Sequence, residues 1–367
     1  MLKKISALLI SICLLTGCST AELGYMALAM ELNQLKSIHL EGSLNMNLSK
    51  ELIENTPGLK KDFSDGGLEA FTEFGSLPVL RYVGQTKTAE NNIEADIKFY
   101  FKQNAEQEEQ YLFNMIIKDN CWYIDTKGVL NIYNLAVLFY PEADKSFISD
   151  FQKETKGYEY ILINYEPIYL EEARLASDEV KVIKELIAEV FKNFETGLVQ
   201  QTDNGYCLKA NAPKAVNCLV KGAAYLSDNS RYVYDTVSKN EWVKENAELE
   251  DYESFSELLL EMKKEALLFQ ESFNAELMAP ESQLSPYKDS YYSIELNKRD
   301  GVYHLTNKLV GVYAGSEFCS IKSTLSISPK EVTVAAPAPA KVYKMYATGG
   351  AYPGGVYEVE VYEVTIL

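Results

Sequence analysis

The sequence predicts an α+β protein in which a large, curved antiparallel sheet carries helices packed on its concave face. Residues 38–125 and 289–334 alternate apolar and polar side chains with the period of two that is typical of strands with one buried face. Between them, residues 128–278 space their apolar side chains three or four apart, as helices do. Because strands and helices come in separate blocks, the order argues against a doubly wound parallel sheet.

The first meander follows a helix that good helix formers predict over 21–36. A short helix broken at Pro57-Gly58 is expected within the mixed segment 50–77. The strands of this meander are expected at 38–48, 79–85, 92–102, 111–117 and 121–124. Four large apolar side chains fall on its dry face, where they are core by default: Phe99, Phe101, Phe113 and Met115.

The central block is predicted to be mainly helical. Helices are expected at 128–140, at 145–155, and from an N-cap at Ser177 to about 197. A strand is expected at 158–165, and a short strand with turns at 204–225. A long helix over 247–278 carries a heptad-like seam, which indicates either a coiled-coil dimer or packing within the chain. The seam lasts only three heptads, which favours packing within the chain.

The second meander, 289–334, contains Arg299-Asp300-Gly301, which is typical of a hairpin turn. The prolines of residues 335–340 lack the amide hydrogen that a central strand needs, so this segment is expected to be a linker. Strands at 342–347 and 356–366 would then form a C-terminal hairpin. The expected organisation is therefore a leader at 1–17, a domain at 18–334, and a linker with hairpin at 335–367.

Composition excludes several classes of function. The chain has 35 Lys+Arg and 53 Asp+Glu, a net charge of −18, which argues against binding to nucleic acid or to anionic lipid through a basic patch. Apolar residues make up 47% of the chain, which argues against intrinsic disorder. With only two histidines, a multi-histidine metal site is not available.

The N-terminus has the features of an export signal. Lys3 and Lys4 precede the short apolar run 5–15, and the run ends in Leu15-Thr16-Gly17-Cys18. This sequence resembles the lipobox of bacterial lipoproteins, which implies cleavage before Cys18 and attachment of diacylglycerol to its sulfur. Loss of the two lysines leaves a net charge of −20 on 350 residues. The expected location is the extracytoplasmic face of the cell membrane. The alternative is an ordinary cleaved signal in which Cys18 is incidental.

Export to an oxidising compartment makes disulfides possible. Four cysteines remain, and they allow three pairings: Cys121, Cys207, Cys218 and Cys319. The short spacing of Cys207 and Cys218 favours a small closed loop, which leaves Cys121 for Cys319. The alternative is four free thiols. No cysteine pair has the spacing of a zinc site.

The lipobox, the helix that leads into KSIHLEGSLNMNLS at 36–49, and the two meanders divided by helices together resemble the LolA/LppX-like lipoproteins. The resemblance implies an open half-barrel with helices inside, which encloses an apolar cavity for lipid or acyl chains. On this resemblance, Phe99, Phe101, Phe113 and Met115 are candidate cavity-lining residues.

No motif of a hydrolase, a nucleotide-binding protein or a metalloprotease is present, and no cofactor is expected. Residues 62–73 match a calcium loop at some positions, but Gly66 and Glu69 depart from it. The sequence therefore predicts a non-enzymatic, lipid-anchored envelope protein that binds an apolar ligand or an envelope protein partner. The alternatives are a solute-binding lipoprotein of a transporter and an envelope hydrolase that uses carboxylates.

Overall fold

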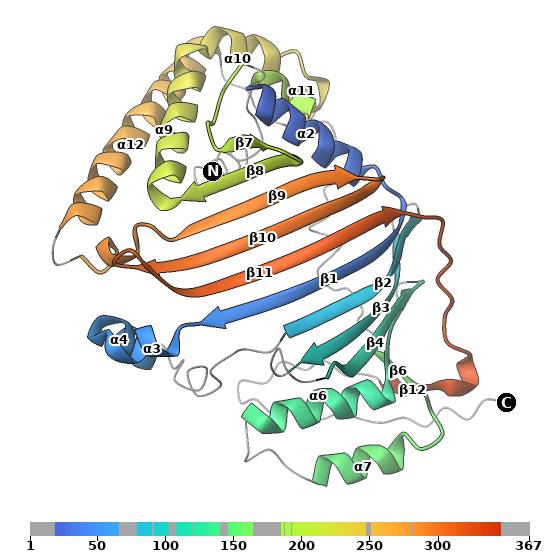
Figure 1. The fold of residues 1–367 in the computed structure, drawn as a ribbon. Helices are drawn as coiled ribbons and strands as arrows, with labels where there is room; N and C mark the ends of the chain where they lie inside the picture. Colours follow the sequence, from blue (N-terminus) through green and yellow to red (C-terminus); the bar gives the residue numbers. More distant parts are fainter. Residues whose placement is uncertain are drawn as a thin grey trace, which may run out of the picture.

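The structure is a computed structural model of the chain. It describes residues 19–65, 79–89, 92–102, 108–119, 121–139, 146–163, 185–186, 188–191, 193–246, 251–279 and 282–345. The described strands form a single open sheet of 12 strands in the order β12-β6-β5-β4-β3-β2-β1-β11-β10-β9-β8-β7 (Figure 1). Neighbouring strands are antiparallel except for β6 and β12. The prediction of a large, mostly antiparallel sheet is therefore confirmed.

The first meander forms where alternation predicted it. Its strands are β1 (Ser37–Leu48), β2 (Val79–Ala89), β3 (Asn92–Lys102), β4 (Gln110–Lys118) and β5 (Cys121–Asp125). Helix α2 (Thr20–Asn33) precedes β1, and the helices after β1 are α3 (Lys50–Asn55) and α4 (Pro57–Asp65), so the predicted break at Pro57 is confirmed.

The second meander also forms, and β1 joins it to the first. Its strands are β9 (Tyr291–Arg299), β10 (Val302–Tyr313) and β11 (Ser316–Pro329). Asp300 and Gly301 both have positive φ, 51° and 79°, as a two-residue hairpin turn requires. Strand β1 pairs with β2 on one side and with β11 on the other. The two meanders are therefore halves of one sheet.

The central block contains short strands between its helices. In chain order, the described elements of this block begin with two helices and three strands: α6 (Thr126–Phe139), α7 (Ser146–Glu154), β6 (Tyr160–Ile163), β7 (Val199–Thr202) and β8 (Gly205–Asn211). The helices that follow are α9 (Ala212–Asp228), α10 (Ser230–Val237), α11 (Glu241–Asn246) and α12 (Tyr252–Met278). The N-cap predicted at Ser177 lies outside the described residues.

Helix α9 corrects the prediction of turns in its region. The Asn211 side chain caps the helix by accepting a hydrogen bond from the Lys214 amide at 3.1 Å. Pro213 lies in the first helical turn, where a missing amide hydrogen costs nothing. The segment between Cys207 and Cys218, which was expected to form a closed loop, therefore contains the start of a helix.

The heptad-like seam of α12 packs within the chain. Leu259 and Ala266 are buried, and Ala266 lies in a cluster with Val220 and Ala223 of α9. The phenyl ring of Phe269, by contrast, is 52% exposed. Packing on α9 therefore accounts for the seam, as the sequence favoured.

After β11, residues 330–338 run extended to a short 3₁₀ turn, Pro339–Lys341, and then to β12 (Val342–Met345). The Val332 amide donates to Ser37 Oγ, and Gln85 Nε2 donates to the Thr333 carbonyl, each at 3.0 Å. Strand β12 pairs in parallel with β6 and so belongs to the main sheet. Its expected hairpin partner, 356–366, lies outside the described residues.

Most helix contacts with the sheet lie near its two edges, and α3 also contacts β11 in the interior of the sheet (Figure 1). Helix α2 contacts β7, β8 and β9, and α9 contacts β8, while α6 contacts β4 and β5. The largest buried cluster lies at the β7–β9 end. Its buried members are Val190, Phe191, Phe194, Leu198, Leu208, Cys218, Leu226, Val233 and Leu259.

Candidate functional site

The strand register gathers apolar side chains on one face of the sheet, here called the apolar face. Two rows cross it, each formed by residues paired from strand to strand. From β9 to β4 the first row is Leu296, Leu305, Leu325, Gly42, Tyr82, Phe99 and Phe113. From β10 to β6 the second row is Tyr303, Ile327, Leu40, Gly84, Ile97, Met115, Ile124 and Ile161.

The apolar face is partly open to solvent. In the first row only Leu296 and Gly42 are buried, and the other five side chains are half-buried. Further members of the face are more exposed: Leu309 at 50%, Ile93 at 62% and Trp122 at 46%. Large apolar side chains that stay accessible along neighbouring strands are typical of a binding surface.

The structure brings together the four side chains that were candidates for a cavity lining. Phe99 and Phe113 stack, with ring centroids 4.3 Å apart, and Met115 lies one row away on the same face. Phe101 lies on the other side of Phe99 along β3 and borders the cavity described below. All four side chains are half-buried.

Gly42 leaves space on β1 for an aromatic side chain of the neighbouring strand. A Cβ atom at position 42 would lie 2.3 Å from Cζ of Tyr82, so the tyrosine ring occupies the space that a side chain would need. Tyr82 in turn lies beside Phe99, with ring centroids 6.2 Å apart. A glycine in mid-strand therefore extends the aromatic surface from β3 to β1.

A cavity of about 300 Å³ opens beside this surface, where α6 meets β3 and β4. Its lining consists of Phe101, Gln110, Tyr111, Leu112, Asn131, Asn134 and Leu135. The Asn131 amide donates to the carbonyls of Tyr111 and Leu112, at 2.9 and 3.0 Å. An irregularity in the β3–β4 register lies beside these carbonyls, so the asparagine satisfies acceptors next to the break.

Sequence reasoning missed this cavity because residues 128–140 were expected only to form a helix, with no role at the apolar face. The available signal was the pair Asn131 and Asn134, three residues apart and so on neighbouring positions of an otherwise apolar helix.

Asp125 fixes α6 relative to the sheet at the edge of the cavity. Its carboxylate accepts from the amides of Asn114, at 2.6 Å, and Gly128, at 3.0 Å, and so ties β4 to the first turn of α6. Burial raises the pKa of the neighbouring Tyr111 hydroxyl, and the charge of Asp125 raises this pKa further. Tyr111 therefore stays a neutral hydroxyl at physiological pH.

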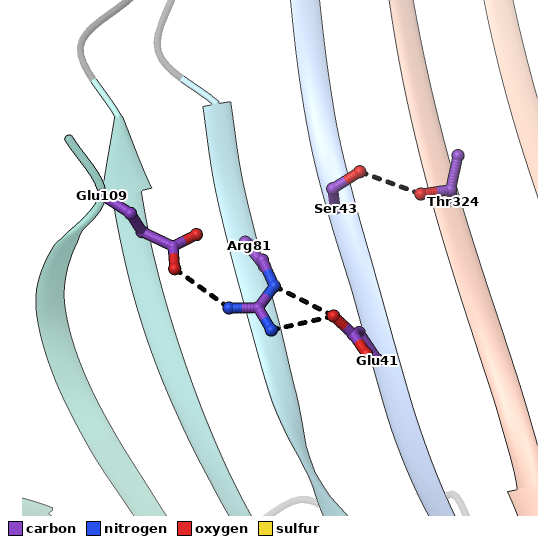
Figure 2. A network of polar contacts seen from close by, with 5 residues as sticks. All are labelled: Glu41, Ser43, Arg81, Glu109 and Thr324. Atoms are coloured by element: carbon purple, nitrogen blue, oxygen red, sulfur yellow. Dashed lines mark hydrogen bonds and ion pairs between the residues drawn. The ribbon is translucent and has the colours of Figure 1, made fainter. Parts of the chain in front are cut away.

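The opposite face of the sheet carries mainly polar side chains. Arg81 donates to Glu41 at 2.8 and 3.1 Å and to Glu109 at 3.0 Å, while the hydroxyls of Ser43 and Thr324 lie 2.8 Å apart (Figure 2). The hydrogen bond to Glu41 is the largest cause that raises the pKa of Arg81. The carboxylates of Glu41 and Glu109 therefore both form ion pairs with the Arg81 guanidinium, on an exposed surface.

No disulfide joins the four described cysteines, which corrects the expected pairings. Cys121 on β5 and Cys319 on β11 are five strands apart. That is roughly 24 Å along the sheet at a strand spacing of ~4.8 Å, and a disulfide needs Cα atoms within ~7 Å. Cys207 shares the polar face of β8 with Lys209, whereas Cys218 is buried with Leu208 of the other face. Neither expected pair can therefore bond.

Several other predicted features fall wholly or partly outside the described residues. Residues 1–18, including Cys18, lie outside the described residues, as does most of the calcium-like segment 62–73. Within the described part of the chain, no cluster of three or more His, Cys, Asp or Glu side chains is placed to hold a metal ion. None of the described helices is both long enough and apolar enough to span a membrane.

Comparison of this chain with protein-family models, with curated proteins and with solved structures found no match.

Proposed function

We propose that this chain is a lipid-anchored, extracytoplasmic and non-enzymatic protein that binds a lipid or acyl chain on its apolar face. The observation that carries the proposal is the row of half-buried apolar side chains on β10, β11, β2, β3 and β4, which crosses β1 at Gly42. Covering such side chains with an apolar ligand is favourable at about 25 cal/mol for each Å² removed from water.

In this proposal the anchor is the acylated Cys18, in keeping with the resemblance of Leu15–Cys18 to a lipobox. The apolar face is the concave, ligand-facing side of a LolA/LppX-like half-barrel, and the helices at its two ends flank the ligand. Packing supports this assignment. Helix α2 and the largest buried cluster contact Tyr206 and Leu208, and both of these side chains belong to the apolar face of β8.

The cavity beside α6 suits the polar end of such a ligand. The register row Leu44–Leu80–Phe101–Gln110 leads along the apolar face to the cavity, whose lining also includes Asn131 and Asn134. Amide side chains donate and accept hydrogen bonds without carrying charge. We therefore propose an amphiphile whose chain lies on the apolar face and whose head group hydrogen-bonds in the cavity.

A matched pair of variants tests the binding face. Leu305 and Thr306 are neighbours on β10, both half-buried, with side chains on opposite faces. Leu305→Gln is expected to weaken binding of the fluorescent fatty acid cis-parinaric acid about tenfold, because an unpaired amide in an apolar site costs about 1–3 kcal/mol. Thr306→Gln is expected to bind like the parent chain. Equal binding by both variants, or no saturable binding by the parent, would contradict the proposal.

Native mass spectrometry of the gently purified protein provides a second readout. The expected result is a lipid mass that stays bound until the protein unfolds. An envelope protein partner is the second occupant considered for this face, and it would be recovered in place of the lipid. A solute-binding function in a transporter is less well supported, because proteins of that class are built from two α/β lobes, whereas the described strands form one sheet.

A further inference from the structure

We propose that the end of the domain formed by the start of α2 and the start of β7 lies directly against the membrane surface, with almost no tether between them. This inference rests on the proposed acylation of Cys18. It goes further by assigning which surface of the protein meets the lipid head groups and which end points away from the membrane.

The first step is that Ser19 is the N-cap of α2. The Ser19 side chain accepts from the Glu22 amide at 3.2 Å, and the Ser19 amide donates back to the Glu22 carboxylate at 3.2 Å. This reciprocal pair is a capping box, which fixes the backbone at the start of a helix. The residue next to the proposed acylation site is therefore already part of α2.

The second step is that Glu22 fastens this helix end to the body of the protein. Its side chain is 2% exposed. The carboxylate accepts from the amides of Thr196 and Gly197, at 2.9 and 3.0 Å, and from the Thr196 hydroxyl. Thr196 and Gly197 lead into β7. One buried carboxylate thus joins the N-terminal turn of α2 to the edge of the sheet, 174 residues further along the chain.

Together these contacts leave a very short tether. The Cα atoms of Cys18 and Ser19 are separated by one peptide unit, about 3.8 Å. A flexible linker of twenty residues would instead allow a root-mean-square reach of about 25 Å. With acyl chains in the bilayer, Ser19 is therefore held close to the head groups, and the domain cannot turn freely about its anchor.

In the proposed orientation, the opposite end of the sheet projects away from the membrane. Strand β7 is one edge of the sheet, and β5 lies nine strands away. At a strand spacing of ~4.8 Å this is roughly 43 Å along the sheet. The side chain of Leu23, in the first turn of α2, is 52% exposed and lies where it can enter the head-group region. In this orientation Trp122 on β5 lies far from the membrane surface.

Energy transfer from tryptophan to dansyl-phosphatidylethanolamine in phosphatidylcholine vesicles tests this orientation. The probe near the anchor is Glu195→Trp, in a Trp122→Phe, Trp242→Phe background. Glu195 is exposed and precedes Thr196, which bonds to Glu22. The distant probe is native Trp122 in a Trp242→Phe background. Transfer is expected to be several-fold greater from position 195. Equal transfer from the two positions would overturn the proposal, provided circular dichroism shows that both variants are folded.

Two controls separate failure of the orientation from failure of the anchor. A flexible Gly-Ser segment of twenty residues inserted between Cys18 and Ser19 is expected to reduce transfer from position 195 while membrane attachment remains. If the insertion leaves this transfer unchanged, the short tether does not set the orientation. Cys18→Ala is expected to abolish attachment. If that variant still attaches, the proposed lipid anchor fails, whatever the orientation.

Discussion

Replacing Glu22 with alanine is expected to destabilise the folded protein by about 3–5 kcal/mol. The Glu22 carboxylate is buried and accepts from the amides of Thr196 and Gly197. The buried Thr196 amide and the part-buried Gly197 amide each lose an acceptor, at about 1–3 kcal/mol for each, and loss of a capping box adds about 1 kcal/mol. The expected effect is large because one side chain serves the helix end and the sheet edge together.

The assay is urea denaturation of the purified chain, followed by circular dichroism, with the free energy of unfolding extrapolated to zero urea. Glu22→Gln tests the need for two acceptor oxygens, because glutamine has nearly the same shape but only one. The amide oxygen can still accept from Thr196 and Gly197, whereas the amide nitrogen would face the Ser19 amide, which is itself a donor. An intermediate loss of about 1–2 kcal/mol is expected for this variant.

Glu31→Ala is the matched control, because Glu31 lies on the same helix and pairs with Lys298 on the surface. Its hydrogen bond with Lys298 is the largest cause that lowers the pKa of Glu31. Solvent screens this pair, so the control is expected to change the unfolding midpoint very little. A Glu22→Ala loss no larger than that of the control would refute the reasoning.

Three further predictions concern other parts of the sheet. Denatured without reductant, the chain is expected to take up iodoacetamide at all four thiols from Cys121 to Cys319, and a Cys207–Cys218 disulfide in peptide mapping would contradict the structure. In the folded protein, burial raises the pKa of the Cys207 and Cys319 thiols. Less thiolate is then present at pH 8, so both should be alkylated more slowly than free cysteine, with rates that still rise above pH 9. Gly42→Val is expected to lower the unfolding midpoint and to increase exposure of Tyr82, because the new Cβ would lie 2.3 Å from that ring; an unchanged midpoint would count against this packing. Asp125→Ala leaves the amides of Asn114 and Gly128 without their acceptor and should cost about 2–4 kcal/mol in urea denaturation. Asp125→Asn should recover only part of this loss, because the two amides bond to separate carboxylate oxygens and the asparagine side chain has a single acceptor oxygen.

The strands could be predicted because each carries its own signal. From Ile38 to Leu48 the alternation marks both the strand and its dry face, and β1 forms with that face on the apolar side. The neighbours of a strand are set by contacts distant in sequence. No local pattern indicates that β1 pairs with β11, more than 270 residues away, or that the four residues of β12 pair in parallel with β6.

In the candidate site, too, the local pattern could be predicted but the long-range contacts could not. Phe99, Phe101, Phe113 and Met115 share a face through local alternation, and the structure brings them together. The disulfide predictions failed because short spacing in the sequence does not decide on which face of a strand a cysteine lies. Cys207 and Cys218 are separated by the turn from β8 into α9, which places them on opposite sides of the sheet.

The size of the apolar face decides between its two proposed occupants. Removing one CH₂ group from water contributes about 0.8 kcal/mol, so each added methylene of a bound acyl chain should tighten binding about fourfold while uncovered apolar face remains. The gain should stop when the chain outgrows the row from Leu305 on β10 to Phe113 on β4, which spans six strands, or roughly 24 Å. That length is similar to the length of an extended acyl chain of common membrane lipids. Displacement of cis-parinaric acid by saturated fatty acids of increasing length measures this directly. A plateau at long chains supports a lipid ligand, whereas affinity independent of chain length would indicate that the face is built for a protein surface.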